Sequence, residues 1–293
     1  MNKTAIALGT FDGLHKGHIQ VINNTVRLGK ELNLDTAVML FDVHPLSVTN
    51  GVTVPRLITD PDREKLLNEL GAKAVRFEFK KIVNYSKNEF FYDILIKQLK
   101  VGAVSCGENF RFGKNASGNV DYLKQECEKN GIVLSVSPIV SVNGQPVSST
   151  KIRSLIQSGE IERANEMLGR YFSFSSKVLD GKHLGRKLGV PTVNQTLEKT
   201  LVEPKKGVYF SFTVIDGKRY KSITNIGLRP TVENTENVNS ETHILSFNGN
   251  LYGTSPTVEL VSFLRDEKKF ESVEQLREQI ERDIYKRKIS ESE

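Results

Sequence analysis

The glycine-rich stretch GTFDGLHKGH at residues 9–18 constrains the fold more than any other part of this chain. The apolar run at residues 4–8 precedes it and is typical of a short buried strand, while Ile19, Ile22 and Val26 follow it at helical spacing. The stretch therefore fills a turn from a strand into a helix. Glycines in such a turn let the backbone approach a ligand, and the free amides and dipole of the new helix favour an anion. The pattern predicts a site for nucleotide phosphates.

Two histidines of this stretch, His15 and His18, are expected to face the same anion because they lie three positions apart at the start of the helix. A glycine-rich turn with two surface histidines is the alternative interpretation, and H-x-G-H alone favours neither. The complete string is much harder to obtain by chance. We therefore interpret it as a phosphate-binding motif.

Length and composition are those of a soluble enzyme. A chain of 293 residues exceeds the usual size of one compact core, which predicts two domains. No apolar run approaches the ~20 residues of a membrane helix, and no signal-peptide pattern is visible, so we expect a cytoplasmic protein with no membrane partner. Cys106 and Cys127 have neither metal-ligand nor redox spacing and are expected to be reduced and structural. The 41 basic residues are interspersed with 35 acidic ones, so the net charge of +6 indicates a mixed solvated surface and no nucleic-acid partner.

The first half of the chain alternates between two kinds of segment. Apolar strand candidates lie at residues 35–41, 74–79, 101–106 and 132–136. Helices are expected at residues 62–70 and from a capping box formed by Ser86 and Glu89. Such alternation predicts a Rossmann-like α/β domain with a mainly parallel sheet and helices on both faces, in which ligands bind beyond the carboxyl ends of the strands.

Three further motifs fall at such strand ends: FDVHP at residues 41–45, GENFRFGK at 107–114 and SSTKIR at 148–153. A Pro-terminated loop, a hairpin and a helix N-cap at Ser149 are the respective structural alternatives. Alternating aromatic and basic residues also suit stacking on a flat ring and binding of a phosphate. The third motif opens a helix expected to run to about Leu168, and its Lys and Arg oppose the helix dipole, which weakly favours a triphosphate-binding role.

These four segments resemble, in order, motifs of the bacterial bifunctional riboflavin kinase/FMN adenylyltransferase family, the FAD synthetase of the prokaryotic type, within the superfamily of nucleotidyltransferases. The resemblance implies that the N-terminal domain transfers AMP from ATP to FMN and releases pyrophosphate, with His15 and His18 as catalytic residues. It implies that ATP is bound by Gly9, Phe11, Asp12, Gly17, His18, Ser149, Thr150 and Arg153. It implies that FMN is bound by His44, Asn109, Phe110, Arg111 and Lys114. Val43 stands where the family often has Pro, a change expected to alter loop stiffness more than chemistry.

The character of the chain changes after Gly169, where short strand-like runs replace helices. These runs lie at residues 171–179, 207–214, 220–226, 241–247 and 257–263, with hairpin turns expected at 216–217 and 248–250. A small closed antiparallel β-barrel is the economical arrangement for so many short strands. Ser272 and Gln275 cap a final helix expected to cover the barrel with Val273, Leu276, Ile280 and Ile284. The expected domains are residues 1–168 and 169–293.

The string GRKLGVPTVN at residues 185–194 resembles the G-R-x-L-G-x-P-T-x-N motif of riboflavin kinase. A Gly/Pro loop between strands is the alternative. The side-chain oxygens of Thr192 and Asn194 suit a hard cation that carries ATP phosphates. The resemblance implies that these two residues bind Mg²⁺. The resemblance implies that ATP is bound by Gly185, Arg186, Leu188, Gly189, Thr192 and Asn194. Asp180 and Val193 depart from the family pattern, which leaves the detail of the nucleotide loop open.

Glu241 is expected to begin a strand, where a carboxylate is by default solvated. The resemblance implies that it is the general base that takes the proton of the ribityl 5′-hydroxyl as this attacks the γ-phosphate. The segments at residues 225–231 and 263–270 also match family segments beside the flavin, so Arg229, Glu241 and Arg265 are implied to bind riboflavin. The chain is thus expected to convert riboflavin to FMN and FMN to FAD with Mg²⁺ and ATP, as a monomer or weak homo-oligomer.

Two other functions are compatible with parts of this pattern. A nucleotidyltransferase with a different acceptor, such as phosphopantetheine, leaves the P-T-x-N motif without explanation. A flavin-sensing, RNA-binding regulator predicts salt-sensitive RNA binding through the basic surface. That interpretation gives no purpose to His15, His18 and Glu241.

Overall fold

The computed structural model describes residues 3–179, 189–230 and 236–290, which fold into two compact units, Met1–Ser149 and Thr150–Glu293. The change of character at Gly169 lies inside the second unit, after two helices. Within the described ranges, no helix has the length and apolarity needed to cross a bilayer.

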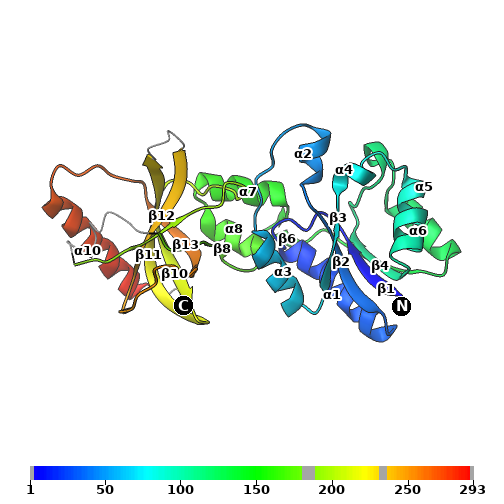
Figure 1. The fold of residues 1–293 in the computed structure, drawn as a ribbon, viewed down its shortest axis with the longest axis horizontal. Helices are drawn as coiled ribbons and strands as arrows, with labels where there is room; N and C mark the ends of the chain where they lie inside the picture. The colour runs from blue at the N-terminus through cyan, green and yellow to red at the C-terminus, as the bar shows by residue number, and fades with distance from the viewer. Residues whose placement is uncertain (1–2, 180–188, 231–235, 291–293) are drawn as a thin grey trace. The chain divides into compact units, whose positions relative to one another are not determined.

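A five-stranded parallel sheet forms the centre of the first unit (Figure 1). Its strands are β1 (Thr4–Leu8), β2 (Asp35–Phe41), β3 (Lys73–Phe77), β4 (Val101–Gly107) and β5 (Val133–Ser137). Their order is β3-β2-β1-β4-β5, as expected for a Rossmann-like domain. The strand order reverses between β1 and β4, where doubly wound sheets open a crevice for ligands at the carboxyl ends. The motifs at residues 9–18 and 107–114 follow these two strands.

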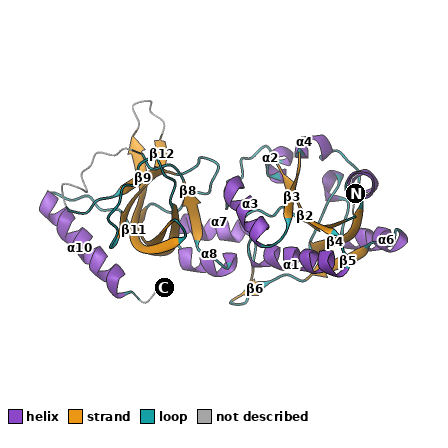
Figure 2. Cartoon of the chain, turned by 60° about the horizontal axis from the view of Figure 1, so that its bottom comes forward, coloured by secondary structure: helices purple, strands orange, loops and turns teal. Residues whose placement is uncertain are grey.

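Helices cover both faces of this sheet (Figure 2). They are α1 (Lys16–Glu31), α2 (Pro45–Thr49), α3 (Asp60–Glu69), α4 (Phe79–Ile82), α5 (Lys87–Glu89), the π-helical η1 (Phe90–Gln98), the short 3₁₀ turn η2 (Lys114–Ala116) and α6 (Val120–Lys129). One core lies beneath α1 and α3 and includes Ile22 and Leu67. The other lies beneath η1 and α6 and includes Phe91 and both free cysteines, whose thiol pKa values burial raises to about 12. The capping box of Ser86 and Glu89 is confirmed.

The second unit begins with two helices where one was expected. α7 (Ser149–Ser158) and α8 (Ile161–Leu168) are separated at Gly159, which has φ +85°, so the prediction of one helix to Leu168 is wrong. A small hairpin of β6 (Ser141–Val142) and β7 (Gln145–Pro146) precedes them at the end of the first unit.

Six antiparallel strands follow and curl around a common interior (Figure 2). They are β8 (Phe172–Ser175), β9 (Val193–Thr196), β10 (Gly207–Ile215), β11 (Lys218–Pro230), β12 (Glu236–Ile244) and β13 (Thr257–Arg265), in the order β8-β13-β10-β11-β12-β9. An isolated bridge pairs Leu179, just beyond β8, with Asn194 in β9. The amide of Gln195 donates to Ser176 O at 2.6 Å and to Pro256 O at 2.9 Å. The predicted small antiparallel barrel is therefore present as a curled sheet, and among the described residues an isolated bridge joins Leu179 to its β9 edge.

Two details of the barrel differ from the sequence predictions. Asp216 (φ 49°) and Gly217 (φ 79°) form the turn between β10 and β11 as expected. The turn predicted at residues 248–250 joins no hairpin, because β12 pairs with β11 and β9 and not with β13. β12 also begins at Glu236 and so places Glu241 in its middle, where the sequence predicted a strand start.

Hydroxyl groups fill much of the barrel interior. Ser211 Oγ lies 2.8 Å from the hydroxyls of both Ser222 and Thr224, and Thr224 Oγ1 lies 2.9 Å from that of Thr242. Thr213 donates to Ser222 at 3.0 Å. All five side chains are buried, and each of these hydroxyls has a partner on a neighbouring strand, so this group of hydroxyls is internally satisfied.

The final helix, α10 (Val273–Ile289), is capped by Ser272 as predicted, and the apolar stripe predicted to cover the barrel is buried only in part. Ile284 packs against the cluster formed by Val208, Ile223 and Leu245. Val273, by contrast, is 59% exposed. The deeply buried residues are Asp283 and Arg287, whose guanidinium lies 4.6 Å from the Phe212 ring centre and donates to Ser211 O at 3.0 Å.

Candidate active sites

The two histidines of the first motif lie together at the start of α1. His15 is the N-cap, and its Nδ1 accepts a hydrogen bond from the His18 amide at 3.3 Å. Their imidazoles stack with ring centres 3.6 Å apart and planes 14° apart. Because a helix N-terminus favours anions, this pair lies where a phosphate group is stabilised.

The loop before these histidines is strained and held by buried side chains. Phe11 (φ 49°) and Leu14 (φ 43°) both adopt the left-handed conformation, which costs non-glycine residues about 1–2 kcal/mol each. Both side chains are almost fully buried, and burial of such a residue contributes about 1.5–3 kcal/mol. Gly13 has φ +82°, and a Cβ there would lie 2.8 Å from Leu57 Cβ. Gly13 is thus required by the packing of Leu57.

The remaining predicted ATP-binding residues are distributed over this loop and α7. Ser149 Oγ donates to Asp12 O at 2.9 Å, which brings the third motif to the first. The Asp12 carboxylate accepts the Leu57 amide at 2.9 Å, so it has a structural partner. Gly9 follows β1, and Gly17 lies in the first turn of α1. Within α7, Thr150 comes directly after Ser149, and the buried Arg153 comes one helical turn later.

The second motif starts a helix instead of ending a loop. Pro45 is the first residue of α2, and His44 is its N-cap, with Nδ1 accepting the Leu46 amide at 3.2 Å. Asp42 Oδ1 accepts the Phe79 amide at 2.9 Å and so ties this loop to the start of α4.

The segment at residues 107–114 combines a buried ring with exposed polar residues. Phe112 is buried in the core, and Phe110 stacks on it with ring centres 5.5 Å apart. Asn109, Arg111 and Lys114 are exposed. An isolated antiparallel bridge between Phe112 and Gly118 gives the segment a hairpin character.

In the second unit, strand register aligns two predicted kinase residues. Glu241 lies directly opposite Asn194 of β9 and directly opposite Asn225 of β11. Residues paired in this way share one face of the sheet, with Cβ atoms about 4.5–5.5 Å apart. Thr192 precedes β9 by one residue. The predicted base and a predicted metal ligand are thus neighbours, and the Glu241 side chain is exposed.

The other predicted kinase residues have different placements. Arg265 is engaged with buried Asp283 through Nε at 3.0 Å and Nη2 at 2.8 Å, which fastens α10 to β13. Arg229 lies in β11 opposite Asn237. Gly189 is exposed in a left-handed conformation. Gly185, Arg186 and Leu188, like Asp180, lie outside the described residues.

Two residues beside Glu241 were not assigned a role from the sequence. His243 lies two residues further along β12, and its Nδ1 donates to Pro191 O at 2.8 Å, just before Thr192. Burial lowers the pKa of His243, so its imidazole is neutral at pH 7. The Asn225 amide donates to Glu267 at 3.2 Å. His243 and Asn225 lie inside sequence segments that match the family, and this match is the signal by which they could have been identified from the sequence.

The donors around Glu241 fit a magnesium ion. Thr192 and Asn194 have neutral side-chain oxygen atoms, and Glu241 adds a carboxylate directly opposite Asn194 on the neighbouring strand. Hydroxyl, amide and carboxylate oxygens are the ligands that a hard cation prefers, and Mg²⁺ bound with phosphates needs few from the protein. Across the described part of the chain, no three His, Cys, Asp or Glu side chains gather in a metal-binding group.

Comparison with known proteins identifies both halves of the chain. A model of FAD synthetase matches residues 1–151, and a model of riboflavin kinase matches residues 168–290. The bifunctional riboflavin kinase/FMN adenylyltransferase of Buchnera aphidicola is 33% identical over 97% of this chain and 92% of that protein. Those of Escherichia coli K12 (33% identical, 95% of this chain and 90% of that protein) and Bacillus subtilis (30%, 96% and 90%) are similar.

A solved structure resembles this chain over nearly its whole length. A crystal structure described as a macrolide-efflux protein from Streptococcus pneumoniae superposes with a TM-score of 0.87 and 26% identity, over 99% of this chain and 94% of that one. The family models and the relatives cover both units in the order in which the motifs occur. The chain belongs to the family of bifunctional riboflavin kinase/FMN adenylyltransferases.

Proposed function

We propose that this protein makes both flavin cofactors in succession. It phosphorylates riboflavin with ATP to give FMN and ADP, and it transfers AMP from a second ATP to FMN to give FAD and pyrophosphate. Residues 1–168 perform the adenylyl transfer and residues 169–293 the phosphorylation. The observation that supports this most directly is the alignment of Glu241 with Asn194, because it unites a base and a cation ligand in the unit that resembles a kinase.

The adenylyl transfer needs no nucleophile from the protein. A phosphate oxygen of FMN attacks the α-phosphorus of ATP, and the bond to pyrophosphate breaks as the new bond forms. The enzyme therefore supplies alignment and stabilises the charge that develops on the leaving pyrophosphate. His15 and His18, at the start of α1, provide this stabilisation, and Ser149 and Arg153 of α7 hold the phosphates.

The FMN of this reaction is held by the loops after β2 and β4. The residues involved are His44, Asn109, Phe110, Arg111 and Lys114. The exposed cationic and amide groups bind the phosphate, and the flavin lies against the Phe110 ring.

The phosphorylation of riboflavin needs a base, because its nucleophile is an alcohol. Glu241 accepts the proton of the ribityl 5′-hydroxyl as its oxygen bonds to the γ-phosphorus and the bond to ADP breaks. Thr192 and Asn194 hold Mg²⁺, which neutralises phosphate charge when bound. His243 keeps the P-T-x-N segment in place through Pro191 O.

The remaining expectations concern the surroundings of the protein. Both reactions use Mg²⁺ and take place in the cytoplasm. The partners are riboflavin, FMN and ATP, without nucleic acid, and the protein is a monomer or weak homo-oligomer.

One assay tests the whole proposal. Purified protein is incubated with riboflavin, ATP and Mg²⁺, and riboflavin, FMN and FAD are separated by chromatography over time. FMN is expected to form first and FAD to follow. A protein that forms neither flavin nucleotide has a different function.

A further inference from the structure

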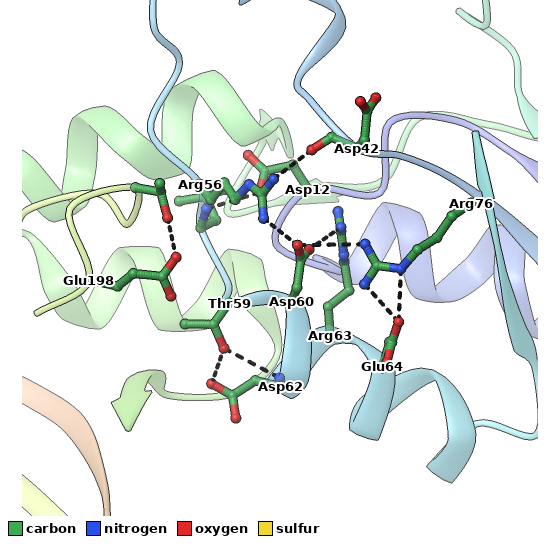
Figure 3. Close-up of polar contacts among 12 residues, drawn as sticks. Asp12, Asp42, Arg56, Thr59, Asp60, Asp62, Arg63, Glu64, Arg76 and Glu198 are labelled. Atoms are coloured by element: carbon green, nitrogen blue, oxygen red, sulfur yellow. Dashed lines mark hydrogen bonds and ion pairs between the residues drawn. The ribbon is translucent and has the colours of Figure 1, made fainter. Parts of the chain in front are cut away.

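Two consecutive residues connect the first motif to the second. The Leu57 amide donates to Asp12 Oδ1 at 2.9 Å, and the Arg56 guanidinium donates to Asp42 O at 2.8 Å (Figure 3). Asp12 belongs to the loop that carries His15 and His18, and Asp42 belongs to the loop that carries His44. The short segment between α2 and α3 thus holds both loops at once.

Asp60, at the start of α3, holds Arg56 in place. Its carboxylate forms ion pairs with Arg56 at 2.6 Å, with Arg63, and with Arg76 at 3.6 Å (Figure 3). Arg76 also pairs with Glu64 at 2.7 Å. Asp60 is the residue of this network that contacts all three arginines.

The network is partly buried, and its arginines keep Asp60 ionised. The Arg63 side chain is only 6% exposed, whereas those of Arg56 and Asp60 are 23% and 31% exposed. Burial tends to raise the pKa of Asp60, but the hydrogen bond from Arg56 and the positive charges of the arginines outweigh burial and lower it. Asp60 also lies in the first turn of α3, where the helix dipole favours a carboxylate.

We propose that Asp60 is a positioning residue for adenylyl transfer and acts through Arg56. By fixing this guanidinium, Asp60 fixes the carbonyl of Asp42 and with it the loop of His44, at a set separation from the loop of Asp12. This inference rests on the proposed adenylyltransferase function. The separation of the two loops sets the shape of the FMN site beside the ATP phosphates, so displacement of the His44 loop weakens FMN binding.

The test begins with Asp60→Asn, which keeps the shape of the side chain and removes its charge. Arg56 then loses its ionic partner, and the Asp42 carbonyl loses an oriented donor. The KM for FMN is expected to rise about 10-fold or more, as is common when a charged hydrogen bond is lost, whereas kcat changes less. Glu64→Gln is the matched control, because Glu64 lies on the same helix, pairs with Arg76 and is 45% exposed. It is expected to leave KM and kcat unchanged.

A double-mutant cycle separates positioning from a general structural role. If Asp60 acts through Arg56, then Arg56→Met alone raises the KM for FMN, and adding Asp60→Asn to it produces little further change. If the two substitutions acted independently, their separate factors on the KM for FMN would multiply in the double variant. Riboflavin phosphorylation and the melting temperature are measured in every variant, and phosphorylation is expected to be unaffected.

Each outcome has a defined meaning. A normal KM for FMN in Asp60→Asn, or multiplicative effects in the double variant, overturns the proposal. If Asp60→Asn does not fold, Arg56→Met decides, and a normal KM for FMN in that variant overturns it equally. Failure of the wild-type protein to make FAD from FMN would instead refute the adenylyltransferase function itself.

Discussion

Substitution of Glu241 by glutamine gives the most direct test of the kinase mechanism. Glu241 occupies the middle of β12 between Asn194 and Asn225, and its side chain is exposed. Glutamine preserves the shape, the backbone ladder and a hydrogen-bonding oxygen. A surface replacement of this kind changes the free energy of unfolding by about 0.5 kcal/mol or less. The variant therefore folds normally, and any loss of activity reflects chemistry.

The expected loss follows from the one property that glutamine lacks. A positioned general base contributes about 10²–10⁴ in rate, which corresponds to about 3–5 kcal/mol of transition-state stabilisation. The amide introduced by Glu241→Gln cannot accept the proton of the ribityl hydroxyl, so kcat for riboflavin phosphorylation is expected to fall by this factor. The KM for riboflavin is expected to change little, because the ground-state contacts remain.

The assay compares two flavins in one variant. With riboflavin as substrate, FMN formation is followed by chromatography; with FMN as substrate, FAD formation is followed in the same way. FAD formation is expected at the wild-type rate, since its phosphate nucleophile is already ionised. Near-normal phosphorylation would refute the general-base role, and loss of both activities would show that Glu241 is structural.

Four further substitutions test separate parts of the structure. His18→Ala is expected to reduce FAD formation by about 10²–10³ and make FMN accumulate from riboflavin, and unchanged FAD formation would argue against a phosphate-binding role. Asn194→Ala is expected to raise the Mg²⁺ concentration needed for half-maximal FMN formation, and an identical magnesium titration would favour a purely structural loop. Arg287→Ala is expected to lower the free energy of unfolding of the second unit by about 2–5 kcal/mol, from a lost charged hydrogen bond and cation–π contacts, and an unchanged melting temperature would contradict this. His243→Gln tests a pH effect. The pKa of His243 is lowered in the folded state, so on acidification the unfolded chain is protonated first and wild-type stability falls as pH drops below about 6.5. The glutamine variant is expected to show a smaller fall in melting temperature over this pH range, and a fall equal to that of the wild type would count against this assignment.

Local patterns predicted the framework of both units well. β2 has the expected bounds, because its apolar run is bordered by polar residues, and the Asp216-Gly217 turn was recognisable from its chemistry. The start of β12 was missed because Glu236 and its neighbours are polar and carry no hydrophobic alternation. A turn was expected at residues 248–250 because Asn-Gly is a local signal, whereas the partner of β12 is decided by strand pairing across the sheet.

The candidate sites show the same division between local and distant information. His15 and His18 were found because glycine spacing and helix geometry act within a few residues. Arg56 and Asp60 were not, because charged residues beside a proline are also typical of a solvated loop. Only the fold brings Arg56 to the carbonyl of Asp42.

The hydrogen-bonded hydroxyls inside the barrel restrict which substitutions this protein can accept during evolution. Ser211, Thr224 and Thr242 form a chain in which each hydroxyl serves a neighbour on another strand. Replacement of Thr224 by an apolar residue removes the hydrogen-bond partner of Thr242, at a cost of about 1–3 kcal/mol, whereas replacement of both Thr224 and Thr242 by apolar groups of the same shape is closer to neutral. Substitutions along this chain are therefore expected to be accepted in correlated pairs, so that related barrels carry either the complete hydroxyl chain or an apolar substitute for it.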